Sequence, residues 1–169
     1  DGKPSTRKVS FFSPYLDTYM IPQLKELSDY GVDGAWIDGE CWAVEPDYGK
    51  ESLKRFKEET GIIEIPKSPA DKYYPEFLEY TRGLFRNHMT KYIDAIHQYN
   101  RDFQITSNWA YSSIMPEKVT IGVDYLSGDV TPQNGVYRSA FEARCLAPQG
   151  KPWDLMAWGF SWDGGKMPM

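Results

Sequence analysis

The stretch Gly31-Val-Asp-Gly-Ala-Trp-Ile-Asp-Gly-Glu-Cys-Trp42 is the strongest indication of fold and chemistry in this chain. Its central run, Val32 to Ile37, is short, mostly apolar and bounded by glycines, which predicts a buried β-strand. The strand ends at a carboxylate, Asp38, and Glu40 and Trp42 follow closely. A buried strand that ends at an acid, with a second acid and an aromatic ring beside it, is typical of enzymes that present a carboxylate to a sugar.

The composition is that of an ordinary globular domain. We expect residues 1–169 to form a single domain, because this length suffices for a hydrophobic core and 41% of the residues are hydrophobic. The net charge of −5 argues against a nucleic-acid partner, and the apolar runs are too short to span a membrane. Aromatic residues make up 15% of the chain, and those near strand ends are suited to stack on a sugar ring.

The cysteines and histidines show no metal-binding spacing. His88 and His97 fall nine residues apart in one helical segment, so they cannot converge on a single ion. Cys41 and Cys145 are expected to be free buried thiols rather than a disulfide. We therefore expect neither a metal ion nor another cofactor.

Hydrophobic periodicity predicts strands that alternate with helices. Asp17 is a candidate cap for the first helix, and Gly31 is suited to end it. Residues 41–49 and 62–73 are expected to be loops. The expected helices run from about 18 to 30, from 50 to 60 and from about 75 to 99, and the expected strands are 9–13, 32–38, 103–109, 123–129 and 154–160.

This alternation implies a mainly parallel sheet, whose carboxyl ends would share one ligand-binding edge. We expect the central part of a longer (β/α)₈ TIM-barrel-like enzyme, with a complete, open doubly wound domain as the alternative. No glycine-rich phosphate fingerprint follows a strand, which argues against a nucleotide site. A partial barrel has unpaired sheet edges, which would favour a homo-oligomer. The expected edge carries Ser13, Asp38, Asn108, Asp129 and Phe160.

Two carboxylates that flank a glycosidic bond can hydrolyse it. Asp38 suits a nucleophile because a strand end holds it rigidly, although an Asp-Gly pair is also a common turn signal. Its partner must stay protonated near neutral pH, through burial or a nearby negative charge. Glu40, Asp129 and Glu142 are the candidate acids, Glu142 as an acid on an edge strand. The residues expected to shape a sugar pocket are Trp42, Asn108, Trp109 and Trp158.

Three landmarks resemble family-29 α-L-fucosidases and related hypothetical glycosidases with a barrel fold. The segment from Tyr15 to Gly39 is similar to their "L-x-E-L-x-x-x-Y" helix and a strand ending in "W-[FI]-D-G", whose Asp is the nucleophile of a retaining mechanism and matches Asp38. Ser127-Gly-Asp-Val-Thr-Pro132 resembles the family's "G-D-x-x-T-P-E", and residues 153–160 resemble its "W-E … W-G-Y" strand.

The resemblance implies a retaining exo-glycosidase, α-L-fucosidase-like, that acts on an oligosaccharide or glycoside in the periplasm or outside the cell. Gln133 departs from the family, because many members have a Glu acid/base at that position and Gln cannot supply a proton. Two alternatives therefore stay open. One is a carbohydrate-binding barrel that has lost its acid, and the other is an aspartate-nucleophile α-glycosidase like those of families 31 and 36.

Overall fold

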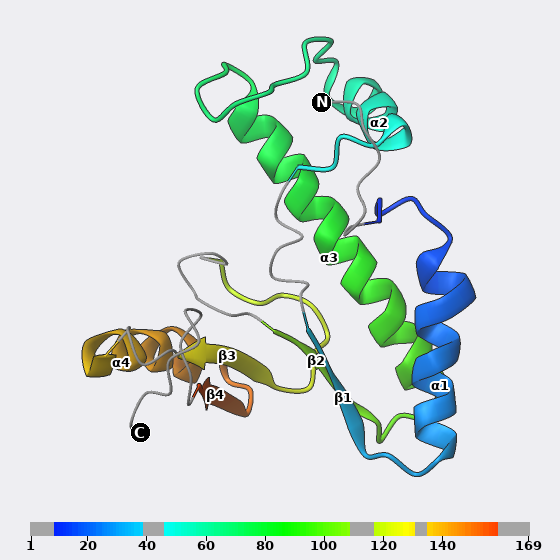
Figure 1. Ribbon diagram of the computed structural model, residues 1–169, viewed down its shortest axis with the longest axis vertical. Coiled ribbons are helices and arrows are strands. Elements are labelled where there is room, and N and C mark those ends of the chain that lie inside the picture. The colour runs from blue at the N-terminus through cyan, green and yellow to red at the C-terminus, as the bar shows by residue number, and fades with distance from the viewer. Residues whose placement is uncertain (1–8, 39–45, 109–116, 131–134, 159–169) are drawn as a thin grey trace.

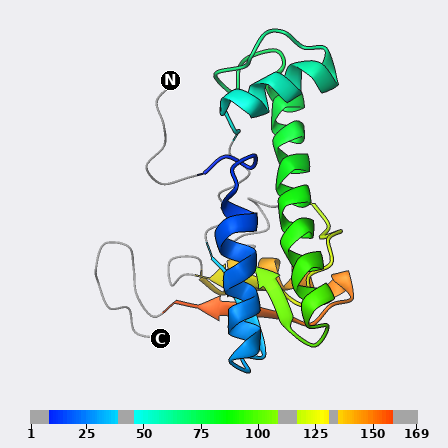
Figure 2. The same cartoon turned by 90° about the vertical axis from the view of Figure 1, so that its right-hand side faces the viewer.

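The computed structural model describes residues 9–38, 46–108, 117–130 and 135–158 (Figure 1). The long helix α3 runs through the molecule, α1 lies beside its carboxyl-terminal half, and α2 lies near its amino-terminal end (Figures 1 and 2). The elements in chain order are η1 (Leu16–Met20), α1 (Ile21–Asp29), β1 (Gly34–Ile37), α2 (Lys50–Thr60), α3 (Tyr74–Tyr99), β2 (Gln104–Ser107), β3 (Leu126–Val130), α4 (Gly135–Leu146), η4 (Ala147–Gln149) and β4 (Trp153–Ala157).

The four strands form two parallel pairs. β1 pairs with β2 in the register Gly34↔Gln104, and β3 pairs with β4 in the register Leu126↔Trp153. An isolated parallel bridge between Asn108 and Ser127 connects the two pairs. Because every pairing is parallel, the carboxyl ends of all four strands point toward the same side.

The expectation of a (β/α)₈ barrel is wrong. The described residues form two two-stranded sheets and four α-helices, which is too few strands to close a barrel. The predicted strand at 9–13 is also wrong, since Phe11 to Ser13 form a turn. This segment is bonded to a loop instead, because the Ser10 hydroxyl and the Phe11 N–H both donate to Asp47 Oδ2, at 2.7 and 3.2 Å.

The predicted helices are confirmed, with one change at the first. It begins earlier than expected, as a π-helical turn that contains Asp17, so Asp17 does not cap it and instead pairs with Lys91 at 2.6 Å. Gly31 and Gly61 follow their helices with φ of 79° and 73°. Glycine reaches this left-handed region without a steric cost, which explains why both helices end where predicted.

Helix α4 is the element that sequence reasoning missed. Residue 142 was expected on an edge strand, whereas residues 135–146 are helical. The buried positions of this helix are Glu142 and Leu146, so an acid occupies part of its inner face. That acid interrupts the apolar pattern by which an amphipathic helix is recognised.

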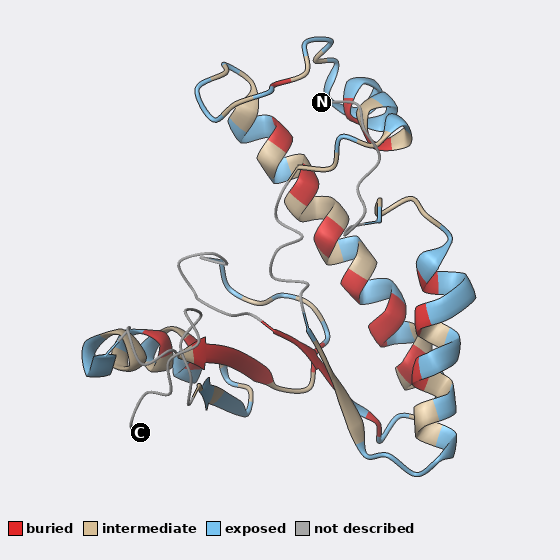
Figure 3. Cartoon of the chain, viewed as in Figure 1, coloured by how far each residue is buried: buried red, intermediate tan, exposed pale blue. Residues whose placement is uncertain are grey.

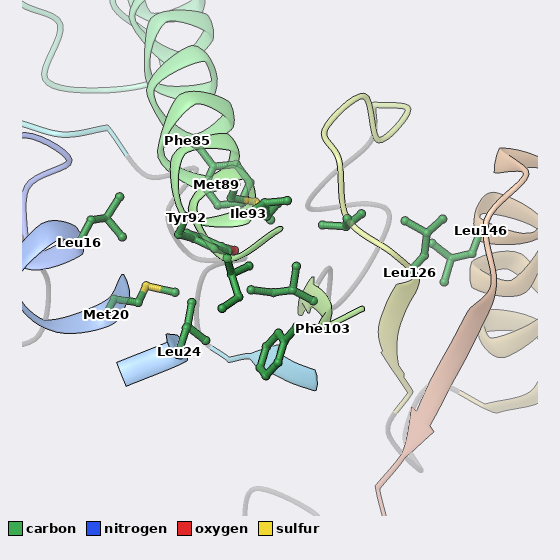
Figure 4. Packing of buried hydrophobic residues seen from close by; sticks show 13 residues of the cluster. Leu16, Met20, Leu24, Phe85, Met89, Tyr92, Ile93, Phe103, Leu126 and Leu146 are labelled. Carbon is green, nitrogen blue, oxygen red and sulfur yellow. The ribbon is translucent and has the colours of Figure 1, made fainter. Parts of the chain in front are cut away.

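The core lies where α3 meets η1, α1 and the strands. Tyr92 and Ile96 of α3 are fully buried and pack with Leu24 of α1 and with Phe103 and Ile105 at β2. Figure 4 shows Tyr92, Leu24 and Phe103 close together in this cluster, and Figure 3 shows buried residues along α3 and in β2 and β3. This cluster joins α3 to β2 and to Leu126 at the start of β3.

Asp124 ties the two sheets to α3. Its Oδ2 accepts hydrogen bonds from the Ile105 N–H at 2.7 Å and lies 3.0 Å from Nε2 of His97. Its own N–H donates to the carbonyl of Ile105 at 2.9 Å. One side chain therefore joins the end of α3, the strand β2 and the segment that leads into β3.

Replacing Gly34 with alanine is expected to lower the free energy of unfolding by about 1–3 kcal/mol. A Cβ at this position would collide with the main-chain carbonyl oxygen of Gln104, its partner in β2. The matched control is Gly83→Ala inside α3, where a new Cβ has no described neighbour within 4 Å. That change should raise stability by up to about 1 kcal/mol through helix propensity. Urea unfolding measures both, and equal stabilities for the two variants would contradict the β1–β2 pairing.

Candidate functional site

Four polar or aromatic residues gather where the parallel strands end. Asp38 directly follows β1, Asn108 directly follows β2, Asp129 is the fourth residue of β3, and Trp158 directly follows β4. The sequence predicted all four as site residues. The prediction that Asp38, Asn108 and Asp129 share one edge is confirmed by the contacts described next.

Asn108 is fixed by the backbone on both sides. Its N–H donates to the carbonyl of Ile37, the last residue of β1, at 2.9 Å. It also forms the isolated bridge to Ser127 of β3. The side chain therefore lies at the junction of the two sheets, between the end of β1 and β3, and is buried.

The side-chain amide of Asn108 joins two carboxylates. Its Nδ2 donates to Oδ1 of Asp38 at 3.1 Å and to Oδ2 of Asp129 at 3.1 Å. An amide nitrogen carries two hydrogens, so it can serve both acceptors. The opposite orientation of the amide would place its oxygen against two carboxylates, and the acceptors therefore determine which atom is the nitrogen.

The two carboxylates lie in different environments. Asp38 is exposed, whereas Asp129 is only 4% exposed. Burial raises the pKa of Asp129 above its usual value, and the negative charges of Asp38 and Asp154 raise it further. Hydrogen bonding to Asn108 and to the Trp158 side chain opposes this rise without cancelling it. Pairs of acids with diverging environments are how proteins divide acid and base tasks.

The second oxygen of Asp129 has weaker hydrogen bonding than the first. Its Oδ1 is buried and accepts no hydrogen bond of good geometry from the described residues. A buried carboxylate oxygen without a good donor is costly when the group is ionised. Protonation of Asp129 removes much of that cost, in keeping with the raised pKa.

Asp154 is a charged neighbour that sequence reasoning did not select. It lies on β4, and its Oδ1 accepts a hydrogen bond from the Ser127 hydroxyl at 2.5 Å. The same carboxylate contributes to the raised pKa of Asp129. Its effect follows from the parallel register Ser127↔Asp154, which places it beside β3. No pattern within residues 153–157 alone indicates that register.

Glu142 occupies a different setting from the one expected. It is 1% exposed on α4, and its Oε1 lies 2.8 Å from Nε of Arg138, one turn earlier on the same helix. The expectation of an edge strand is wrong, because the segment is helical. An ion pair on one helix is a sufficient reason for a buried acid, and the acid/base role of Glu142 stays a prediction.

Three expected site residues, Glu40, Trp42 and Trp109, lie outside the described residues, as do Phe160 of the expected edge and Gln133, which replaces the family's acid/base. Cys41 is outside them too, while Cys145 is a free thiol of intermediate exposure. Within the described ranges, no group of three or more His, Cys, Asp or Glu side chains is arranged to hold a metal ion. None of the described helices has the length and apolar character that crossing a bilayer requires.

No protein-family model, curated protein or solved structure matches this chain. The chemistry of the strand ends is therefore the ground on which a function can be argued.

Proposed function

We propose that this chain is a retaining exo-glycosidase, with Asp38 as nucleophile and Asp129 as acid/base. The observation that carries the proposal is the carboxylate pair bridged by Asn108 at the ends of neighbouring parallel strands. The resemblance of the segments around Asp38, Asp129 and Trp158 to α-L-fucosidases makes a terminal α-L-fucoside the first substrate to test.

The separation of the pair suits retention. Asp38 Oδ1 and Asp129 Oδ2 each lie 3.1 Å from the same nitrogen, so these oxygens are at most twice that distance apart. Retaining glycosidases hold their carboxyl groups about 5–5.5 Å apart, and inverting enzymes hold them about 6.5–9.5 Å apart to admit a water. The bridge therefore favours direct attack by one carboxylate over activation of a water between the two.

The difference in exposure between Asp38 and Asp129 is the basis for assigning one as nucleophile and the other as acid/base. Asp38 is exposed and can approach the anomeric carbon, while buried Asp129, with its raised pKa, is suited to carry a proton. In the first step Asp129 gives its proton to the glycosidic oxygen as a carboxylate oxygen of Asp38 bonds to the anomeric carbon and the aglycone leaves. In the second step Asp129 takes a proton from water, which attacks that carbon and releases Asp38.

The charge of Asp38 suits this change of role in Asp129. While Asp38 is ionised, its charge contributes to the raised pKa of Asp129 and favours the acid form. Once Asp38 forms the neutral glycosyl ester, that contribution disappears, and the base form of Asp129 becomes easier to reach. The same two side chains can thus serve both half-reactions.

Trapping of the intermediate tests this function. The full chain is incubated with 2-deoxy-2-fluoro-α-L-fucosyl fluoride and with the corresponding glucosyl and galactosyl fluorides, and peptide mass spectrometry locates the adduct. We expect one glycosyl adduct on Asp38 with one member of this panel. The matched control is Asp17→Asn, which changes an exposed acid paired with Lys91 and should leave labelling intact.

Two results would overturn the assignment. An adduct on a residue other than Asp38 would give the nucleophile's role to that residue. Sugar binding without an adduct from any of the three reagents would favour a carbohydrate-binding protein over an enzyme.

A further inference from the structure

We infer that Asn108 is the positioning residue of the Asp38–Asp129 pair: its amide nitrogen bonds to both carboxylates and holds them at a set separation. The inference rests on the proposed function for its catalytic meaning, but the juxtaposition itself is structural. It gives Asn108 a role other than the sugar contact that the sequence suggested.

The first support is that the amide nitrogen already donates hydrogen bonds to both carboxylates. Both of its hydrogens are used, one on Asp38 and one on Asp129, and the side chain is only 4% exposed. A sugar hydroxyl that accepted from this nitrogen would have to displace a carboxylate. Asn108 therefore acts on a substrate through the two acids and does not touch the sugar through this nitrogen.

The second support is the rigidity of its attachment. The Asn108 N–H is hydrogen-bonded to the carbonyl of Ile37, the residue before Asp38. The Asn108 backbone also forms a β-bridge to Ser127, two residues before Asp129. Asp129 thus lies on a strand, and Asp38 and Asn108 directly follow strands whose spacing is set by backbone pairing. Strands hold functional groups more accurately than loops do.

The third support is electrostatic. Two carboxylates this close repel each other, and the negative charge of Asp154 adds to the repulsion. β3 also packs against α4, which contributes the ion pair of Glu142 with Arg138. The amide donor favours the ionised form of buried Asp129, so the loss of the amide would raise the pKa of Asp129 further. With the amide in place, part of the repulsion between the two carboxylates is offset.

A purely structural role makes a different prediction. The backbone contacts of Asn108 do not depend on its side chain, so Asn108→Ala retains them while removing the bridge. If the side chain only fills space, the variant loses stability and every titration stays in place. If it positions the pair, the titration of Asp129 moves to higher pH.

The test is a carbon-13 NMR titration of the aspartate carboxyl groups in the full chain, with assignments from Asp38→Asn and Asp129→Asn. In Asn108→Ala we expect the titration of Asp129 to move to higher pH, because this acid loses a hydrogen bond to its ionised form. With a substrate found by the trapping panel, the alkaline limb of the pH–rate profile should move to higher pH, and kcat should fall more than KM rises. The control is Asn100→Ala, which removes an amide hydrogen-bonded to Ser28 Oγ at 2.9 Å and should leave the titration of Asp129 unchanged.

A second measurement requires no variant. In the unaltered protein, the side-chain NH₂ signals of Asn108 should shift with pH at the same midpoint as the carboxyl carbon of Asp129. An unshifted Asp129 titration in Asn108→Ala, or NH₂ signals that do not change at that midpoint, would overturn the inference even if Asp38 is labelled. Shifted titrations without labelling would uphold the bridge and remove the proposed function, so the two failures are distinguishable.

Discussion

Asp38→Asn is expected to reduce turnover by more than about 10⁴-fold, because an amide cannot attack the anomeric carbon to form the glycosyl ester. The replacement has the same size, and its Oδ1 can still accept from Asn108 Nδ2. Since Asp38 is exposed, the free energy of unfolding should change by no more than about 0.5 kcal/mol. Initial rates on the aryl glycoside that matches the trapping result, together with urea unfolding, measure the two effects.

A chemical rescue makes this prediction sharper. Asp38→Ala should regain turnover when azide is added, because the small anion can enter the space left by the carboxylate. The product should be a glycosyl azide with the opposite anomeric configuration, since the attack comes from the face that Asp38 occupied. Asp38→Asn with a tenth or more of the parent activity, or an equal loss in Asp17→Asn, would remove Asp38 from the nucleophile's position.

The elements with strong local signals were predictable. Helix α2 was predicted with the bounds that the structure shows, and α3 begins at Tyr74, one residue before the predicted start. Both helices have apolar residues at a sustained helical period, and for α2 the glycine that follows marks its end. The four strands were also located, because apolar runs bounded by polar residues are a local property of the chain.

The errors arose where a distant side chain decides the structure. Residues 9–13 contain an apolar pair, yet Ser10 and Phe11 donate hydrogen bonds to Asp47, which lies more than 30 residues further along the chain. Helix α4 was hidden because its inward acid, Glu142, is compensated by Arg138. The barrel was inferred from the order of elements, but order does not establish how many strands pair.

The site was predictable in its members and not in its contacts. Parallel strands bring Asp38, Asn108 and Asp129 to one side, and that follows from the alternation of elements. The bridge depends on the pairing of Asn108 with Ser127, which is an isolated contact between two sheets. Register of this kind is set by packing in three dimensions, so the sequence could not show that the amide stands between the acids rather than beside a sugar.

The remaining large effect concerns Asp129. Asp129→Asn is expected to slow hydrolysis of glycosides with poor leaving groups by about 10²–10⁴-fold, because the glycosidic oxygen then leaves without a proton. The loss should be smaller in the first step for a dinitrophenyl glycoside, whose leaving group needs no proton. The alkaline limb of the pH–rate profile should also disappear, since that limb reports ionisation of the acid. An equal loss for both leaving groups would exclude Asp129 as the acid and favour Glu142 or Glu40.

The same variant should change how stability depends on pH. Because the pKa of Asp129 is raised in the folded protein, its contribution to stability is fully present below the unfolded value of about 3.9 and is lost as pH rises through the folded pKa. Asparagine does not ionise, so the variant lacks this loss. The unfolding free energy of Asp129→Asn relative to the parent should therefore increase between pH 4 and pH 7, as measured by urea unfolding at several pH values. A difference that stays constant with pH would mean that Asp129 ionises as readily in the folded chain as in the unfolded one, and would remove the physical basis for its role as a proton donor.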